Sequence, residues 1–116
     1  MRGLHLTADL YNCRCEAQWL SDMRALGTWA RQASEAVGLE VRGELVDGQS
    51  VALLLPHSHV CLHTWPDERG ATVDVHVASG EGDLSAKARG LMYALVNRFA
   101  PEWTEQRSLD RGTEAP

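Results

Sequence analysis

Apolar and polar residues alternate in several segments of the chain, and a period of two residues is the pattern of a β-strand. Asp47-Gly48, between two of these segments, is a strong signal for a tight hairpin turn. Residues 50–55, which follow this turn, are apolar on both faces, and this favours a central position in a sheet. The predicted strands are residues 3–13, 39–46, 50–55, 57–65 and 71–78.

Two further segments have the three- and four-residue spacing of an amphipathic helix. The first runs from about Cys15 to Val37, and Gly38 follows it as a C-terminal cap would. The second runs from about residue 83 to Phe99, and Pro101 is predicted to end it.

The order of these elements is strand, long helix, several strands and helix. This order predicts an α+β fold, a two-layer sandwich in which an antiparallel sheet carries both helices on one face. We expect one domain over residues 1–104 and a loose polar C-terminal tail over residues 105–116. The second face of the sheet needs a cover, so we also expect a homodimer.

Composition excludes several classes of protein. The 116 residues carry a formal net charge of -5 with one lysine and scattered arginines, which argues against a nucleic-acid binder. No apolar run approaches the ~20 residues that span a membrane, and the first residues lack the layout of a signal peptide. We therefore expect a cytoplasmic protein without a membrane partner. Three cysteines, an odd number, indicate no disulfide framework.

The candidate chemistry lies in residues 57–63, which hold three histidines, a serine and a cysteine. Because side chains alternate along a strand, two faces can be assigned to this segment. Ionisable groups at this density are costly to bury without a purpose, and this favours a functional site. One face holds His57, His59, Cys61 and His63, and the other holds Ser58, Val60 and Leu62.

Two segments resemble a known family. Residues 3–13 resemble the opening strand of small prokaryotic S-adenosylmethionine (AdoMet) decarboxylases. Residues 55–67 resemble the self-processing segment of that family, through the pattern Ser-His-x-x-x-His-Thr-Trp-Pro, and Val73-Asp74 matches the strand that follows. The resemblance covers residues 3–100, and its pattern is specific.

The resemblance implies a pyruvoyl enzyme of polyamine and spermidine biosynthesis. Ser58 would attack the carbonyl carbon of His57, the chain would be cut between them, and Ser58 would become the pyruvoyl group. That ketone would form a Schiff base with the substrate amine and take up electrons as carbon dioxide leaves. By motif position His63 is the processing base, Ser50 assists processing, and Asp67 stands where a glutamate usually holds the ribose of AdoMet.

The sequence departs from the family pattern at residues that carry chemistry. His57 replaces the glutamate before the cut, but the reaction needs a carbonyl there rather than a particular side chain. The cysteine that donates a proton after decarboxylation in the family falls on Ala78, which cannot donate one. Cys61, on the same predicted face as His63, is the first candidate replacement, and His76 is another.

A further departure concerns the substrate. Residues 43–46 read Gly-Glu-Leu-Val where the family places an aromatic ring against adenine. Glu44 could instead pair with a basic side chain, so L-ornithine or L-arginine is the alternative to AdoMet. Trp65 is another substrate-binding candidate, although a core residue that supports the motif is the simpler interpretation.

Two other hypotheses stay open. His57, His59, Cys61 and His63 include the His-x-His spacing that suits zinc, copper or nickel, although one straight strand rarely supplies a whole coordination sphere. Ala78 also motivates a non-catalytic relative that acts as a binding partner.

Overall fold

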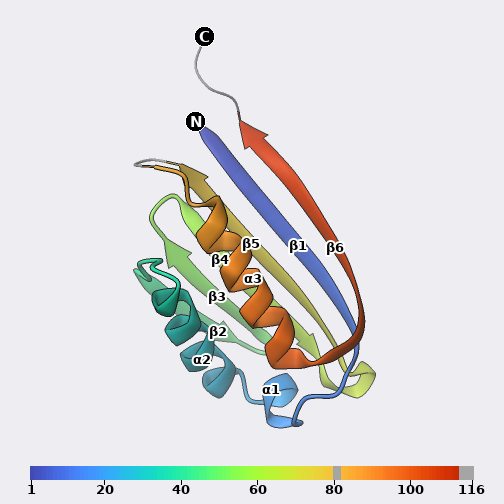
Figure 1. Cartoon of the computed structure of the whole chain (residues 1–116). Coiled ribbons are helices and arrows are strands. Elements are labelled where there is room, and N and C mark those ends of the chain that lie inside the picture. The colour runs from blue at the N-terminus through green and yellow to red at the C-terminus, as the bar shows by residue number, and fades with distance from the viewer. Residues whose placement is uncertain (80–81, 113–116) are drawn as a thin grey trace.

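The computed structural model describes residues 1–79 and 82–112, and these form one six-stranded antiparallel sheet covered by helices (Figure 1). Each strand pairs antiparallel with its neighbours. The strands lie in the order β2-β3-β4-β5-β1-β6. They are β1 (Arg2–Cys13), β2 (Gly43–Asp47), β3 (Ser50–Leu55), β4 (Ser58–Trp65), β5 (Gly70–Ser79) and β6 (Pro101–Gly112).

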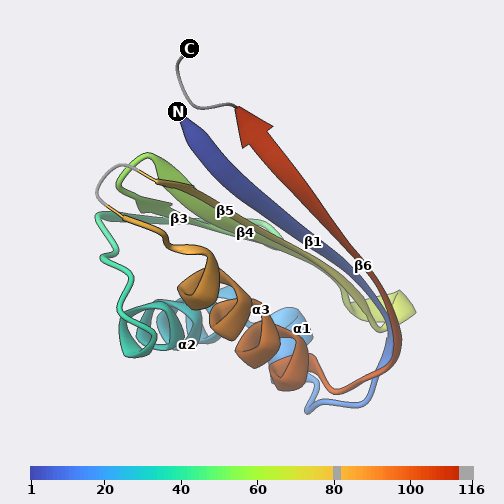
Figure 2. The same ribbon diagram turned by 45° about the horizontal axis from the view of Figure 1, so that its top comes forward.

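The helices lie on one face of this sheet, as Figure 2 shows. Helix α2 (Met23–Ala36) packs against β2 and β3, and α3 (Ser85–Phe99) packs against β5 and β1. The single turn α1 (Gln18–Ser21) lies against β4, and a 3₁₀ turn, η1 (Pro66–Glu68), joins β4 to β5. The predicted two-layer α+β sandwich is confirmed.

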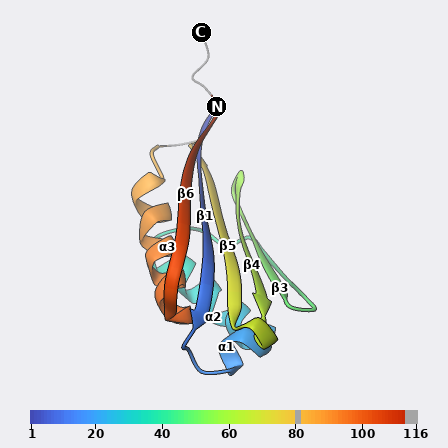
Figure 3. The ribbon, with the colours of Figure 1, turned by 90° about the vertical axis from the view of Figure 1, so that its right-hand side faces the viewer.

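The core fills the space between the two layers. Alternate strand residues point into it and meet the apolar stripes of the helices. Burying one such large side chain contributes roughly 2 kcal/mol. In the described part of the chain, no helix lies on the second face of the sheet, as Figure 3 shows. Core residues include Leu6, Val60, Leu62, Val75, Leu26, Leu91 and Phe99.

The long N-terminal helix predicted from Cys15 to Val37 is wrong in one respect, because Asp22 divides it. Asp22 has the extended angles φ -102° and ψ 92°, and its carboxylate accepts a hydrogen bond from the Ala25 N–H at 3.1 Å. It thereby caps α2, and side-chain capping competes with continuation of a helix. Gly38 follows α2 with a φ of 90°, as predicted.

The prediction of a loose tail from residue 105 is wrong for residues 105–112. These residues belong to β6, which pairs with β1 along its length and forms the edge of the sheet. Stacking of Trp103 on Tyr11, with ring centroids 4.0 Å apart, fixes the start of the strand. The edge is polar and charged, as exposed edges usually are, so no apolar alternation marked it. Residues 113–116 lie outside the described residues.

Smaller differences concern element ends. The strand predicted from residue 39 begins at Gly43, because the Leu39 N–H bonds the Ser34 carbonyl at 3.0 Å and closes the end of α2. The Asp47-Gly48 turn joins β2 to β3 as predicted, with Gly48 at a φ of 58°. Within residues 1–79 and 82–112, no helix has the length and apolar character needed to cross a membrane.

Candidate active site

The predicted cleavage point lies in the tight turn that joins β3 to β4. Leu55 pairs with Ser58, so the loop of this hairpin consists of Pro56 and His57 alone. His57 is exposed and has a φ of 54°, in the left-handed region that costs a non-glycine residue about 1 kcal/mol. The peptide bond before Ser58 is therefore accessible and follows a strained residue.

Ser58 is the first residue of β4, and its hydroxyl is held in place. It is 5% exposed and shares one face of β4 with the buried Val60 and Leu62, as the sequence predicts. The Oγ atom accepts a hydrogen bond from the Ala78 N–H at 3.0 Å. Ala78, where the family has its cysteine, therefore lies directly beside the serine.

A hollow of about 370 Å³ opens beside Ser58. Imidazoles and one guanidinium form its polar lining, and leucines form the rest. The hollow is open to solvent, in keeping with its place at the end of the β3–β4 hairpin. It is lined by Leu54, Leu55, His57, Ser58, His59, His76 and Arg111.

Three histidines form a row across neighbouring strands at this hollow. His59 of β4 pairs with His76 of β5, and His76 pairs with His5 of β1. The rings of His59 and His76 stack with centroids 5.1 Å apart, and the His5 ring meets them edge-on at 6.2 and 5.7 Å. Burial, with repulsion from His59, His5 and Arg111, lowers the pKa of His76.

The other predicted processing residues meet at the opposite end of β4. Ser50 pairs with His63, and its Oγ lies 2.7 Å from the His63 Nδ1. His63 and Trp65 are exposed on the open face, and Asp67 follows in η1. Since a strand rises about 3.3 Å per residue, Ser58 and His63 of one chain are roughly 16 Å apart.

Two candidates lie outside both clusters. Cys61 of β4 pairs with Asp74 of β5, two residues along β4 from His59. Burial and the Asp74 carboxylate raise the pKa of the Cys61 thiol. Glu44 lies on the helix-covered side, with its carboxylate 3.9 Å from the Arg31 guanidinium of α2. The structure therefore brings neither residue to Ser58.

The metal hypothesis finds no support in the geometry. Among residues 1–79 and 82–112, no group of three or more His, Cys, Asp or Glu side chains is placed to hold a metal ion.

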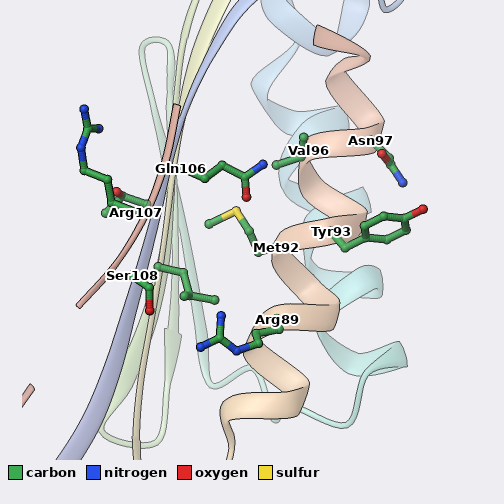
Figure 4. A pocket seen from close by; sticks show the side chains of 10 residues that line it. Arg89, Met92, Tyr93, Val96, Asn97, Gln106, Arg107 and Ser108 are labelled. Atoms are coloured by element: carbon green, nitrogen blue, oxygen red, sulfur yellow. The ribbon is translucent and has the colours of Figure 1, made fainter. Parts of the chain in front are cut away.

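A second hollow, of about 460 Å³, lies between α3 and β6 and is lined by residues such as Arg89, Tyr93 and Gln106 (Figure 4). It contains none of the residues that the sequence singled out.

Sequence reasoning missed Arg111, which lines the hollow, and the contact of the His5 ring with His59 and His76. The short connection between β4 and β5 suggests that these two strands pair, and this pairing could have placed His59 opposite His76. His5 and Arg111 come from strands that are distant in sequence, and only the strand order places them there.

An α+β sandwich with a serine at the start of one hairpin strand and histidines along its open face fits a decarboxylase made as a proenzyme. The sequence matches the S-adenosylmethionine decarboxylase family over residues 4–112. The chain therefore belongs to the S-adenosylmethionine decarboxylase family.

Individual relatives agree with this assignment. The S-adenosylmethionine decarboxylase proenzyme of Hydrogenobaculum sp. is 32% identical over 113 residues, which is 95% of this chain and 81% of the relative. That of Pyrobaculum neutrophilum is 31% identical over 94% of this chain and 91% of the relative. The crystal structure of the Aquifex aeolicus adenosylmethionine decarboxylase superposes with a TM-score of 0.78 at 30% identity, covering 97% of this chain and 92% of that one.

Proposed function

We propose that the chain cuts itself between His57 and Ser58 and then acts as a pyruvoyl-dependent decarboxylase. The observation that carries this proposal is the placement of Ser58. Ser58 is one of the residues that line the hollow, it follows a strained turn residue, and its hydroxyl oxygen accepts a hydrogen bond from the Ala78 N–H. A pyruvoyl group made there supplies an electron sink beside the α-carbon of the substrate.

The geometry suits each step of the cut. The Ser58 Oγ attacks the His57 carbonyl carbon, a C–O bond replaces the C–N bond, and the amine of residue 58 is freed. A base then takes the Cα proton of residue 58, and Oγ leaves as part of the His57 carboxylate. The Ala78 N–H, 3.0 Å from this oxygen, stabilises the negative charge that forms on it. Water finally replaces the amino group with the ketone oxygen, and ammonia is released.

The base for this cut comes from a second copy of the chain. His63 carries the predicted role, and a proton on Nδ1, donated to Ser50, leaves Nε2 as the basic atom. Within one chain it is too far from Ser58 to act. In the proposed homodimer, the open faces of two sheets pack together around a two-fold axis, and their β4 strands run in opposite directions. This arrangement brings the Ser58 end of each β4 to the His63 end of the other.

The open face has the side chains of an interface. Several large apolar residues on β2, β3, β4 and β6 are exposed on it, and burying their apolar surface would favour association. Two such sheets packed face to face also bury the partly exposed histidine row. The exposed residues are Leu45, Leu54, Trp65, Trp103 and Leu109.

AdoMet is the proposed substrate, because it is the substrate named for the relatives. L-ornithine and L-arginine are the second candidates, on one specific observation. Residues 43–46 present no aromatic ring to the open face: Leu45 lies there, and Glu44 is engaged beneath α2. Release of carbon dioxide from each of the three compounds, measured on the same preparation, decides between them.

Intact-mass spectrometry of the purified protein tests the cut. We expect two fragments divided between His57 and Ser58, with a pyruvoyl group at the start of the second, and an uncut chain for Ser58→Ala. A wild-type chain that stays whole on ageing contradicts the proposal. A cut chain that releases no carbon dioxide from the three compounds instead supports the non-catalytic relative.

A further inference from the structure

After decarboxylation the α-carbon of the substrate needs a proton, and the residue at position 78 cannot supply it. When the bond between the α-carbon and the carboxylate breaks, its electron pair stays behind, and the carbon must then take up a proton. Ala78 lies beside Ser58, but its methyl group has no proton to give. Within the chain that carries the pyruvoyl group, the candidate donors are therefore the other groups at the same hollow.

The lining of the hollow narrows the choice. Its titratable groups are His57, His59 and His76, because the Arg111 guanidinium stays charged. His57 becomes a free chain end once the chain is cut. Cys61 does not line the hollow, and burial and Asp74 raise the pKa of its thiol, so it gives up a proton less readily.

His76 has the better position of the two remaining histidines. A Cβ atom on Gly3 would lie 3.4 Å from the His76 Nε2, so the ring leans toward Gly3. Gly3 pairs with Ala78, whose N–H contacts the Ser58 Oγ. The His76 Nε2 therefore lies beside the Gly3–Ala78 pair, which is the pair next to the serine.

We propose that His76 donates the proton that replaces the departing carbon dioxide, with His59 and His5 as positioning residues for its ring. The inference rests on the proposed decarboxylase function and names a donor for it. A new bond forms between the α-carbon and the proton from Nε2, and His76 is left neutral. Water then releases the amine product, and the proton taken up by the reaction returns to His76.

The surroundings of His76 hold its ring on both sides. His59 stacks on one side at 5.1 Å and His5 meets it edge-on at 5.7 Å. The His76 Nδ1 and the His5 Nε2 are buried and have no hydrogen-bond partner among the described residues. The ring is thus fixed by packing, and Nε2 is the atom left to exchange protons with the hollow.

The same neighbours set the pH dependence of turnover. His5 on β1, His59 on β4 and Arg111 on β6 face His76, and Asp74 lies two residues away on β5. Burial, followed by His59, His5 and Arg111, lowers the pKa of His76. Only the protonated ring can donate, so we expect turnover to fall as the pH rises through this lowered pKa.

The test compares His76→Phe with Cys61→Ala in the full chain, with AdoMet, L-ornithine and L-arginine as probes. His76→Phe is expected to cut normally, since the processing base lies elsewhere, but to lose about a hundredfold in turnover. A proton misplaced onto the carbon of the former ketone converts the pyruvoyl group into alanine and releases the substrate as an aldehyde. Mass spectrometry should therefore find alanine at the start of the second fragment.

Two further variants separate donation from packing. Ala78→Cys added to His76→Phe should restore turnover and suppress the alanine product, because a thiol then lies beside the serine. His59→Phe keeps a ring against His76 but removes a group that lowers the pKa of His76. Its turnover should therefore fall at a higher pH than in the wild type, and its loss of turnover at low pH should be smaller than that of His76→Phe. His76→Gln, with a polar side chain of similar reach, repeats the test if the phenylalanine variant fails to cut.

The outcomes are distinct from those for the proposed function. A wild-type chain that is not cut, or does not decarboxylate, overturns the function and the inference with it. A wild-type chain that turns over, with His76→Phe and His76→Gln equally active and free of the alanine product, overturns the inference alone. A larger loss in Cys61→Ala than in the His76 variants assigns the proton to the thiol instead and also overturns it.

Discussion

The two ends of β4 differ in the candidate residues that they carry. The first end holds Ser58 after a strained turn, beside a hollow lined by imidazoles. The far end holds the Ser50–His63 pair, joined at 2.7 Å, and the exposed Trp65. Residues that are close neighbours in the sequence motif are thus separated along a rigid strand. The difference teaches that one copy of the fold does not bring the proposed nucleophile, Ser58, and the proposed base, His63, together.

The largest expected effect comes from removing either the proposed nucleophile or the proposed base. Ser58→Ala removes the attacking oxygen, and His63→Ala removes the base, so each should prevent cutting. We expect the rate for His63→Ala to fall by at least about a hundredfold, the usual size of a general-base contribution. A time course of fragment formation on denaturing gels measures both. Normal cutting by His63→Ala would show that the far end plays no part.

Next in size is the effect of blocking the contact between the two ends. Leu45 is 67% exposed on the open face, and Leu45→Asp places an unpaired charge there in both copies. Dimerisation should weaken by roughly a hundredfold, and cutting should slow in parallel. Analytical ultracentrifugation measures the first effect.

Tyr93→Asp is the matched control for this substitution. Tyr93 is 72% exposed on α3, on the helix side of the molecule. It should leave both dimerisation and cutting unchanged, because surface substitutions away from an interface have small effects. Equal effects of the two substitutions would contradict an interface on the open face.

A smaller effect is expected at the Ser50–His63 hydrogen bond. Ser50→Ala removes the oxygen that lies 2.7 Å from the His63 Nδ1, so the ring loses its fixed orientation. The loss of about 1 kcal/mol should slow cutting about fivefold. Fragment formation is compared with that of Ser50→Thr, which retains a hydroxyl. A loss as large as that of His63→Ala would give Ser50 a direct chemical role.

The smallest effect concerns strain at the first end. His57 has a φ of 54°, and His57→Gly removes the cost of this conformation. If half of about 1 kcal/mol is released on reaching the transition state, cutting should slow roughly twofold. His57→Asn tolerates a positive φ less well than glycine and should cut faster than His57→Gly. Identical rates for the two variants would show that strain does not assist the cut.

The sequence predicts much of this fold, and the failures have physical causes. Alternation located the inner strands, because each has one face in the core. It missed β6, which is held by backbone bonds to β1 and exposes its charged side chains. The helical spacing of apolar residues continues across Asp22, and this spacing alone does not reveal that the Asp22 side chain caps a new helix.

The candidate site shows the same limits. Motif spacing singled out Ser58, Ser50 and His63, and the hairpin brings the last two together. The predicted strand over residues 57–65 already separates Ser58 from His63, but the spacing of a motif does not tell whether two of its residues act within one chain or between two. The histidine row depends on β5 pairing with β1, and strand order of this kind is set by packing of the whole sheet.

One measurement tests the division between the two ends most directly. His63→Ala and Ser58→Ala chains carrying different affinity tags are produced together, and the mixed dimer is isolated through both tags. We predict that the His63→Ala chain is cut in this mixed dimer, because the Ser58→Ala partner supplies an intact His63, and that it stays whole when produced alone. An uncut His63→Ala chain in the mixed dimer, or two tagged chains that do not purify together, would contradict the account.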